Sequence, residues 1–85
     1  MSYKITYKKS VYKDLAKLEK IDAKKFISKI DKELKTNANQ HPVLKGMFRG
    51  MRKFRVGNYR IVYSIINDDV LILRIAYRKD VYKIQ

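Results

Sequence analysis

Residues 53–63 read Lys-Phe-Arg-Val-Gly-Asn-Tyr-Arg-Ile-Val-Tyr, a stretch that predicts two β-strands joined by a tight turn. Glycine tolerates a positive φ angle and asparagine is enriched in turns, so the Gly-Asn pair at 57–58 allows the chain to reverse. Because side chains alternate between the two faces of a strand, Lys53 and Arg55 share one face. The reversal brings Arg60 back beside Arg55. The hairpin is therefore expected to gather positive charge on one surface of a sheet.

The segments on either side of the hairpin predict an α+β fold. Apolar residues at spacings of three and four predict two helices, with Ser10 and Asp22 as their N-caps. The predicted elements are a strand over 3–7, helices after Ser10 and from 22 to about 35, and strands over 51–56, 59–66 and 70–77. The last strand is apolar on both faces, which is typical of a central strand. We expect a single domain over residues 1–85 with the order β-α-α-β-β-β, a mostly antiparallel four-stranded sheet and both helices packed on one face.

The composition predicts a domain that binds a polyanion. The 85-residue chain has no cysteine and 46% hydrophobic residues, so its core has to come from packing. No apolar run is long enough for a signal peptide or a membrane span, so we expect a cytoplasmic protein. The formal net charge of +13 suggests RNA, DNA, an acidic protein or an anionic membrane surface as partner. The interval between Glu33 and Asp68 has no acidic residue and carries the local basic patch: Lys35, Lys45, Arg49, Arg52, Lys53, Arg55 and Arg60.

Three motifs in order carry a resemblance to a known family. They are Pro-Val-Leu-Lys-Gly at 42–46, Phe-Arg-Val-Gly-Asn-Tyr-Arg-Ile-Val-Tyr at 54–63 and Arg-Lys-Asp-Val-Tyr at 78–82. Together they resemble the RelE/ParE superfamily of toxins from prokaryotic toxin-antitoxin systems, over nearly the whole chain. Within that superfamily the RelE branch cleaves messenger RNA in the ribosomal A site, and the ParE branch poisons DNA gyrase. The cations at 53 and 55 favour the RelE branch, with a gyrase inhibitor, a non-catalytic nucleic-acid-binding module or a toxin with decayed catalysis as alternatives.

The resemblance implies a set of site residues for metal-independent RNA cleavage without a cofactor. Carried over by position, the catalytic residues are Lys53, Arg55, Arg60, Arg78 and Tyr82. Additional RNA contacts are expected from Lys45, Arg49, Arg52 and Lys79. Cleavage by the RNA's own 2′-hydroxyl needs a base, stabilisation of the phosphate and an acid for the leaving 5′-oxygen. Arginines suit the phosphate because guanidinium groups bind its oxygens bidentately. Lys53 is the candidate base, since neighbouring arginines favour its neutral form.

The resemblance also implies partners, which are an acidic antitoxin of the RelB kind in a hetero-oligomer, the ribosome and mRNA, with no membrane partner. Each site residue also has a plain structural interpretation. Lys53 and Arg55 could be solvated cations of an ordinary sheet, and Arg60 could pair with an acid such as Asp80. Tyr59 and Tyr63 fall on the face opposite Arg60 and are expected in the core. The remaining expectations are that His41 lies away from the motif, that Glu19 and Glu33 are solvated, and that Tyr77 stands where many relatives have a histidine.

Overall fold

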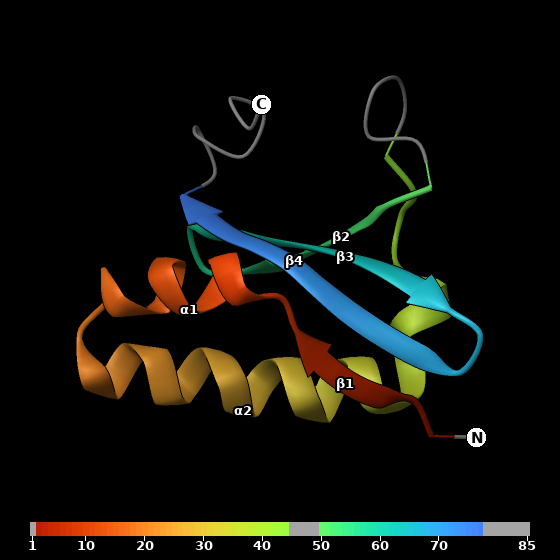
Figure 1. Cartoon of the computed structure of the whole chain (residues 1–85), viewed down its shortest axis with the longest axis horizontal. Helices are drawn as coiled ribbons and strands as arrows, with labels where there is room; N and C mark the ends of the chain where they lie inside the picture. The colour runs from red at the N-terminus through yellow and green to blue at the C-terminus, as the bar shows by residue number, and fades with distance from the viewer. Residues whose placement is uncertain (1, 45–49, 78–85) are drawn as a thin grey trace.

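Two α-helices and four strands make up the described part of the chain, which comprises residues 2–44 and 50–77 of the computed structural model. The elements are β1 (Lys4–Tyr7), α1 (Lys9–Ala16), α2 (Lys20–Asn37), the short 3₁₀-helix η1 (Ala38–Gln40), β2 (Arg52–Val56), β3 (Tyr59–Ile66) and β4 (Asp69–Tyr77). Figure 1 shows α1 and α2 running antiparallel to each other beneath the sheet. The predicted order β-α-α-β-β-β is confirmed, and the predicted strand bounds agree with the structure to within one residue.

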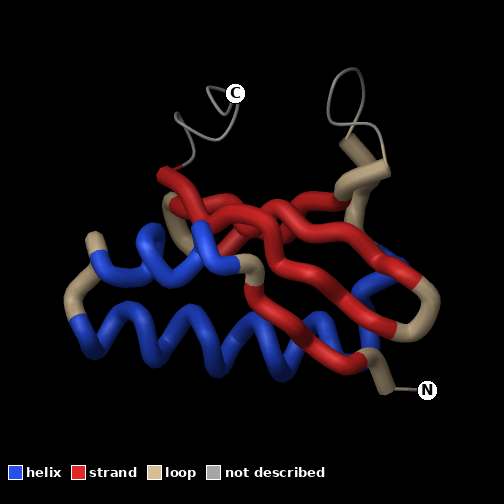
Figure 2. Tube along the Cα trace, viewed as in Figure 1, coloured by secondary structure: helices blue, strands red, loops and turns tan. Residues whose placement is uncertain are grey.

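The sheet is mixed, with the strand order β1-β4-β3-β2. β1 pairs parallel with β4, whereas the β3–β4 and β2–β3 pairs are antiparallel. β4 therefore lies inside the sheet, as its apolar residues on both faces predicted. Figure 2 shows the strands side by side in one twisted layer, with both helices on the same side of it. β2 is an edge strand, so the basic hairpin lies at one border of the sheet.

Two tight turns connect the last three strands. Val56 pairs with Tyr59, so the residues at 57–58 form a two-residue hairpin turn, and Gly57 adopts a φ of 59° there. Glycine populates this region without steric cost, which accounts for its place in the motif. The second turn uses Asn67 at a φ of 57°, between the paired residues Ile66 and Asp69. Asparagine is among the few other residues that tolerate this conformation.

The main core lies between the helices and one face of the sheet. α1 contributes Val11, and α2 contributes Ile30 and Leu34, all of them fully buried. The sheet contributes residues on the face toward the helices, among them Ile61, Tyr63, Val70, Ile72 and Ile75. A smaller cluster of Leu44, Val62 and Ala76 covers part of the opposite face. Burying apolar surface stabilises the folded state by about 25 cal/mol per Å². The helix-facing cluster, which is the larger of the two, is therefore the main source of stability.

Both helices begin earlier than the sequence predicted. The N-caps are Lys8 and Glu19, and neither side chain makes a capping hydrogen bond. Ser10 lies inside α1, where its Oγ donates to the Leu73 carbonyl at 3.4 Å. Asp22 lies in the first turn of α2, where its negative charge interacts favourably with the positive end of the helix dipole. Within 2–44 and 50–77, no helix is long and apolar enough to cross a membrane.

A buried carboxylate from α1 accepts a backbone hydrogen bond from β4 next to a β-bulge. Val62 pairs with Arg74 whereas Tyr63 pairs with Ile72, so β4 carries one extra residue at this point. The Ile75 N–H donates to Asp14 Oδ2 at 3.1 Å, and Arg74 Nε lies 3.3 Å from the same oxygen. Asp14 is only 8% exposed. This carboxylate therefore ties α1 to the interrupted strand.

Tyr63 anchors η1 to the sheet by a buried hydrogen bond. Its hydroxyl donates to the Ala38 carbonyl at 2.7 Å, and the side chain is fully buried. Burial raises the pKa of Tyr63 above the usual tyrosine range, the charge of Glu33 raises it further, and Arg52 opposes both. The hydroxyl therefore keeps its proton in the folded state at pH values where the unfolded chain loses it.

We expect the free energy of unfolding to fall as the pH rises above about 10, by about 1.4 kcal/mol per pH unit for each such tyrosine. A folded-state pKa raised above the unfolded value stabilises the fold at lower pH, and this contribution is lost at higher pH. Urea titrations between pH 8 and 11 test this for wild type and Tyr63→Phe, with the exposed Tyr12→Phe as control. Tyr63→Phe should flatten the slope, and a slope equal to wild type contradicts the assignment.

Candidate functional site

Three cations lie together at the hairpin border of the sheet. Arg55 pairs directly with Arg60 across β2 and β3, and Lys53 pairs with Val62. Cross-strand partners share a face, so these cations lie on the face away from the helices, next to the small Val62 cluster. Arg55 is exposed, and Lys53 and Arg60 are half-buried. Alternation and turn chemistry predicted this arrangement from the sequence.

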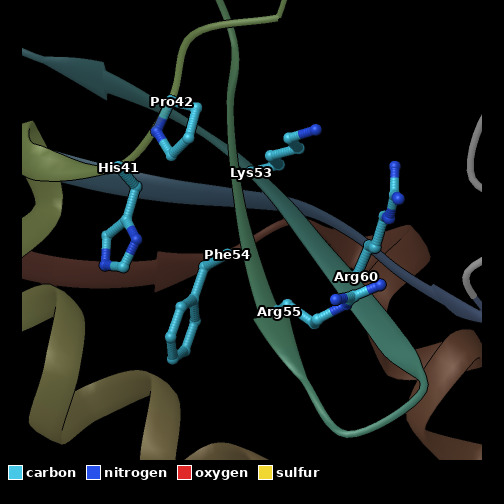
Figure 3. Close-up of a pocket in the computed structure, with 6 residues that line it drawn as sticks. All are labelled: His41, Pro42, Lys53, Phe54, Arg55 and Arg60. Atoms are coloured by element: carbon cyan, nitrogen blue, oxygen red, sulfur yellow. The ribbon is translucent and has the colours of Figure 1, made fainter.

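The cations line a hollow of about 420 Å³ together with His41, Pro42 and Phe54. Figure 3 shows Lys53, Arg55 and Arg60 on one side of β2, and His41 and Phe54 on the other, with Pro42 above them. The hollow therefore lies at the edge of the strand and combines a cationic wall with an aromatic wall. A volume in the range of small-molecule pockets, about 300–1,000 Å³, allows a group as large as a nucleotide to enter.

His41 lies at the site, so the expectation that it lies away from the motif is wrong. Backbone pairing brings this loop to β2, because the Lys53 N–H donates to the Pro42 carbonyl at 3.1 Å. His41 Nε2 is 2.8 Å from Glu33 Oε2, and its ring packs against Phe54 with 4.8 Å between ring centroids. Glu33, which was expected to be solvated, therefore contacts the His41 ring through its carboxylate. Glu33 and Phe54 belong to other elements, α2 and β2, and no local pattern pointed to these contacts.

Arg52 points to the helix side of the sheet, as strand alternation predicted. Its Nη1 donates to the His41 carbonyl at 2.7 Å and to the Asn39 carbonyl at 3.3 Å. A guanidinium group has no acceptor and holds its charge, so it can cross-link two carbonyls of one loop. Arg52 therefore supports the loop that carries His41.

Several residues singled out in the sequence lie outside the described residues: Lys45, Arg49, Arg78, Lys79, Asp80 and Tyr82. β4 ends at Tyr77, whose Cα pairs with Tyr59 next to the hairpin turn. The last described residue of β4 thus lies at the turn end of the hairpin, and residue 78 follows it in sequence. The core positions of the tyrosines are confirmed, since Tyr63 is buried and Tyr59 packs edge-on against Phe26 at 5.1 Å.

The chemistry that this arrangement can perform is anion binding. Two guanidinium groups on directly paired residues, with a lysine two positions along β2, can engage a phosphodiester from one side. Partial burial reduces solvent screening and strengthens such contacts relative to fully solvated cations. The site therefore suits a nucleic-acid backbone or an acidic protein segment.

Comparison with known proteins gives a family and several similar folds. Residues 5–82 match the family model described as ParE toxin of type II toxin-antitoxin system, parDE. The fold is similar to the toxin-antitoxin complex RelBE2 from Mycobacterium tuberculosis, at a TM-score of 0.81 and 23% identity, covering 92% of this chain and 100% of that chain. The archaeal RelE-RelB complex from Pyrococcus horikoshii OT3 matches at a TM-score of 0.64 and 25% identity, covering 92% and 97%. The chromosomal ParDE system from P. aeruginosa matches at a TM-score of 0.67 and 17% identity, covering 89% and 96%. No curated protein matches the chain.

The fold of two helices on a four-stranded sheet is that of toxins of the RelE/ParE superfamily. The chain belongs to the ParE toxin family of type II toxin-antitoxin systems, whose model covers nearly all of it.

Proposed function

We propose that this toxin is a metal-independent endoribonuclease that cleaves mRNA on the ribosome and so inhibits translation. The observation that supports this most is the cluster of Lys53, Arg55 and Arg60 around one hollow at the edge of β2. A nucleic-acid strand laid in that hollow presents a phosphodiester to all three cations. Gyrase inhibition does not call for such a cluster on the hairpin.

The proposed reaction forms one P–O bond and breaks another. The 2′-oxygen attacks the adjacent phosphorus, the bond from phosphorus to the 5′-oxygen breaks, and the products are a 2′,3′-cyclic phosphate and a 5′-hydroxyl. In this proposal, the neutral amine of Lys53 takes the 2′-proton, and Arg55 and Arg60 hold the pentavalent phosphate. By position in the family motif, Arg78 acts as phosphate clamp and proton donor for the leaving oxygen. Tyr82 stacks on a base or orients the nucleotide.

Apart from His41, whose Nε2 contacts Glu33, the described residues that line the hollow include no ordinary general base, so we propose that the rate depends on how the substrate is positioned. Holding reactants in a productive geometry can supply about 7–11 kcal/mol of the barrier, and a ribosome can hold an mRNA strand in that way. The further RNA contacts expected from the sequence, Lys45, Arg49 and Lys79, extend the proposed phosphate grip. Arg52, whose Nη1 donates to two loop carbonyls, is proposed to act by positioning this loop beside the RNA.

The wild-type chain should cut mRNA on translating ribosomes at codon-phased positions and cut the same naked RNA far more slowly. Mapping of 5′ ends in the two reactions measures this, and enzymatic phosphorylation of the new ends tests for a 5′-hydroxyl. Chelation of divalent metal should leave the chemistry on naked RNA unchanged. Equal cleavage rates on ribosomes and on naked RNA would contradict the proposed mechanism.

A second candidate function is inhibition of DNA gyrase. The match to the ParE toxin model over residues 5–82 favours it, as does the similarity to the ParDE system from P. aeruginosa. A gyrase supercoiling assay run beside the ribosome assay separates the two. Accumulation of cleaved plasmid DNA with intact mRNA would assign the chain to gyrase.

We further propose an acidic antitoxin as the partner of this toxin in the cytoplasm. The similar structures include complexes of toxins with RelB and ParD proteins. An acidic segment that folds onto the toxin would bury apolar surface and neutralise part of the +13 charge, forming a toxin-antitoxin hetero-oligomer.

A further inference from the structure

A chain of contacts from α2 holds the aromatic wall of the hollow in place. Glu33 accepts a hydrogen bond from Asn37 Nδ2 at 3.3 Å on one oxygen and contacts His41 Nε2 at 2.8 Å through the other. The His41 ring packs against Phe54 at 4.8 Å with an interplanar angle of 55°. His41 and Phe54 thus form an ordered ledge at the strand edge, opposite the three cations (Figure 3).

A second hollow of about 240 Å³ continues from this ledge onto α2. It is lined by Lys29, Lys32, Glu33 and Phe54, so the ring of Phe54 borders both hollows. Lys29 and Lys32 are exposed and three residues apart, so they lie on one face of the helix. From the hairpin to α2 the surface therefore presents cations, then aromatic rings, then cations again. Single-stranded nucleic acids are bound by this combination, with phosphates on the cations and bases stacked on rings.

We propose that single-stranded RNA lies along a track from the hairpin cations over Phe54 and His41 to Lys29 and Lys32, with one unpaired base at the Phe54–His41 ledge. The choice of RNA rests on the proposed ribonuclease function. The residues that this adds to the site are a base-stacking pair and a distal phosphate contact on α2. They bind the strand beyond the scissile phosphate and take no part in the chemistry.

The strand edge here favours RNA over an extended acidic peptide. A peptide that adds to an exposed edge gains most of its affinity from backbone hydrogen bonds. The loop before β2 already pairs with the start of that strand, through Leu44 N–H to the Met51 carbonyl at 2.8 Å and Lys53 N–H to the Pro42 carbonyl at 3.1 Å. Within residues 2–44 and 50–77, these contacts leave the stretch 54–56 of this edge beside the hollow. An RNA strand binds through contacts of its phosphates and a stacked base with side chains, and it requires no free backbone groups of the strand edge.

Fluorescence anisotropy with the full chain and a labelled 2′-O-methyl RNA pentanucleotide tests the distal contact. This probe cannot be cleaved, so binding is measured apart from any ribonuclease activity. Lys29→Ala with Lys32→Ala should weaken binding about tenfold and reduce the slope of log affinity against log salt by about 1.4, which is 0.7 for each of two phosphate contacts. The control is Lys20→Ala with Lys24→Ala, which removes the same charge from α2 outside both hollows and should have a much smaller effect. Equal effects of the two pairs would contradict the track.

A second probe with one abasic position tests the stacking. Wild type should bind the complete pentanucleotide about tenfold more tightly than its abasic version when the gap falls at the Phe54–His41 ledge. Phe54→Leu should abolish this ratio, whereas a purely structural loss would weaken both probes equally and leave the ratio intact. Thermal melts confirm that the variant is folded, and His41→Gln gives an independent test of the same ledge. An unchanged ratio in both variants overturns the proposal.

An acidic pentaglutamate peptide serves as the competing ligand. If the Lys29 and Lys32 substitutions weaken the peptide and not the RNA, the track belongs to an acidic protein and the RNA proposal is wrong. If the ribonuclease proposal is wrong but the RNA track is correct, the two assays give different answers. The wild type would then leave mRNA on ribosomes uncut, while the pentanucleotide would still depend on Lys29, Lys32 and Phe54.

Discussion

Arg60→Ala is expected to slow codon-phased mRNA cleavage on ribosomes by about 10²–10³-fold, which is the usual effect of removing one preorganised donor to a developing anionic charge. Arg60 pairs directly with Arg55 and lines the same hollow as Lys53, so its loss removes one arm of the proposed phosphate grip. Single-turnover cleavage of a defined mRNA on stalled ribosomes measures the effect. The same loss is expected for Arg55→Ala.

Arg60→Lys distinguishes geometry from charge. Lysine restores the positive charge but not the two parallel N–H bonds of a guanidinium, so it should recover only a small part of the rate. Lys24→Ala serves as a charge-matched control on an exposed position of α2 and should cleave at nearly the wild-type rate. Full cleavage activity of folded Arg60→Ala would show that this residue takes no part in the reaction.

Asp14→Ala is expected to lower the free energy of unfolding by about 3 kcal/mol, because it leaves the Ile75 N–H and the Arg74 charge without their carboxylate. In a domain of this size that loss corresponds to a drop of roughly 15 °C in Tm. The Asp14 side chain is 7% exposed, so water compensates little. Urea unfolding and thermal melts at neutral pH measure both quantities.

Asp14→Asn is the informative companion variant. Its amide oxygen can still accept from the Ile75 N–H, but it lacks the charge that faces Arg74, so about half of the loss should remain. Asp22→Ala removes an exposed carboxylate from the first turn of α2 and should cost less than about 1 kcal/mol. If Asp14→Ala and Asp22→Ala destabilise equally, Asp14 does not close the bulge in the way described.

Local patterns were enough to predict the hairpin and its cations. Period-two alternation and a glycine at the turn determine that Arg55 meets Arg60, and both properties are visible within a few neighbouring residues. The helix starts were predicted less well because tertiary contacts override capping preference. Ser10 is the example, since its hydroxyl reaches the Leu73 carbonyl on β4 and no capping bond forms.

The aromatic side of the site could not be predicted from local sequence. His41 reaches the hollow only because α2 supplies Glu33, β2 supplies Phe54, and Arg52 holds the loop carbonyls. The contact of Asp14 with β4 could not be predicted either. The bulge beside it shifts the alternation of side chains along β4, but the strand stays apolar, so the sequence gives no sign of the bulge. Both residues depend on tertiary contacts between different elements, which for Asp14 are 61 residues apart in the chain.

The parallel pairing of β1 with β4 has a consequence for biosynthesis. Lys4 pairs with Asp69 and Tyr7 with Ile72, so the first strand to leave a ribosome waits for the last one before its hydrogen bonds can form. Contacts between chain ends so far apart slow folding, because loop closure precedes the gain from pairing. The sheet of a newly made chain thus stays incomplete until the residues of β4 have emerged from the ribosome.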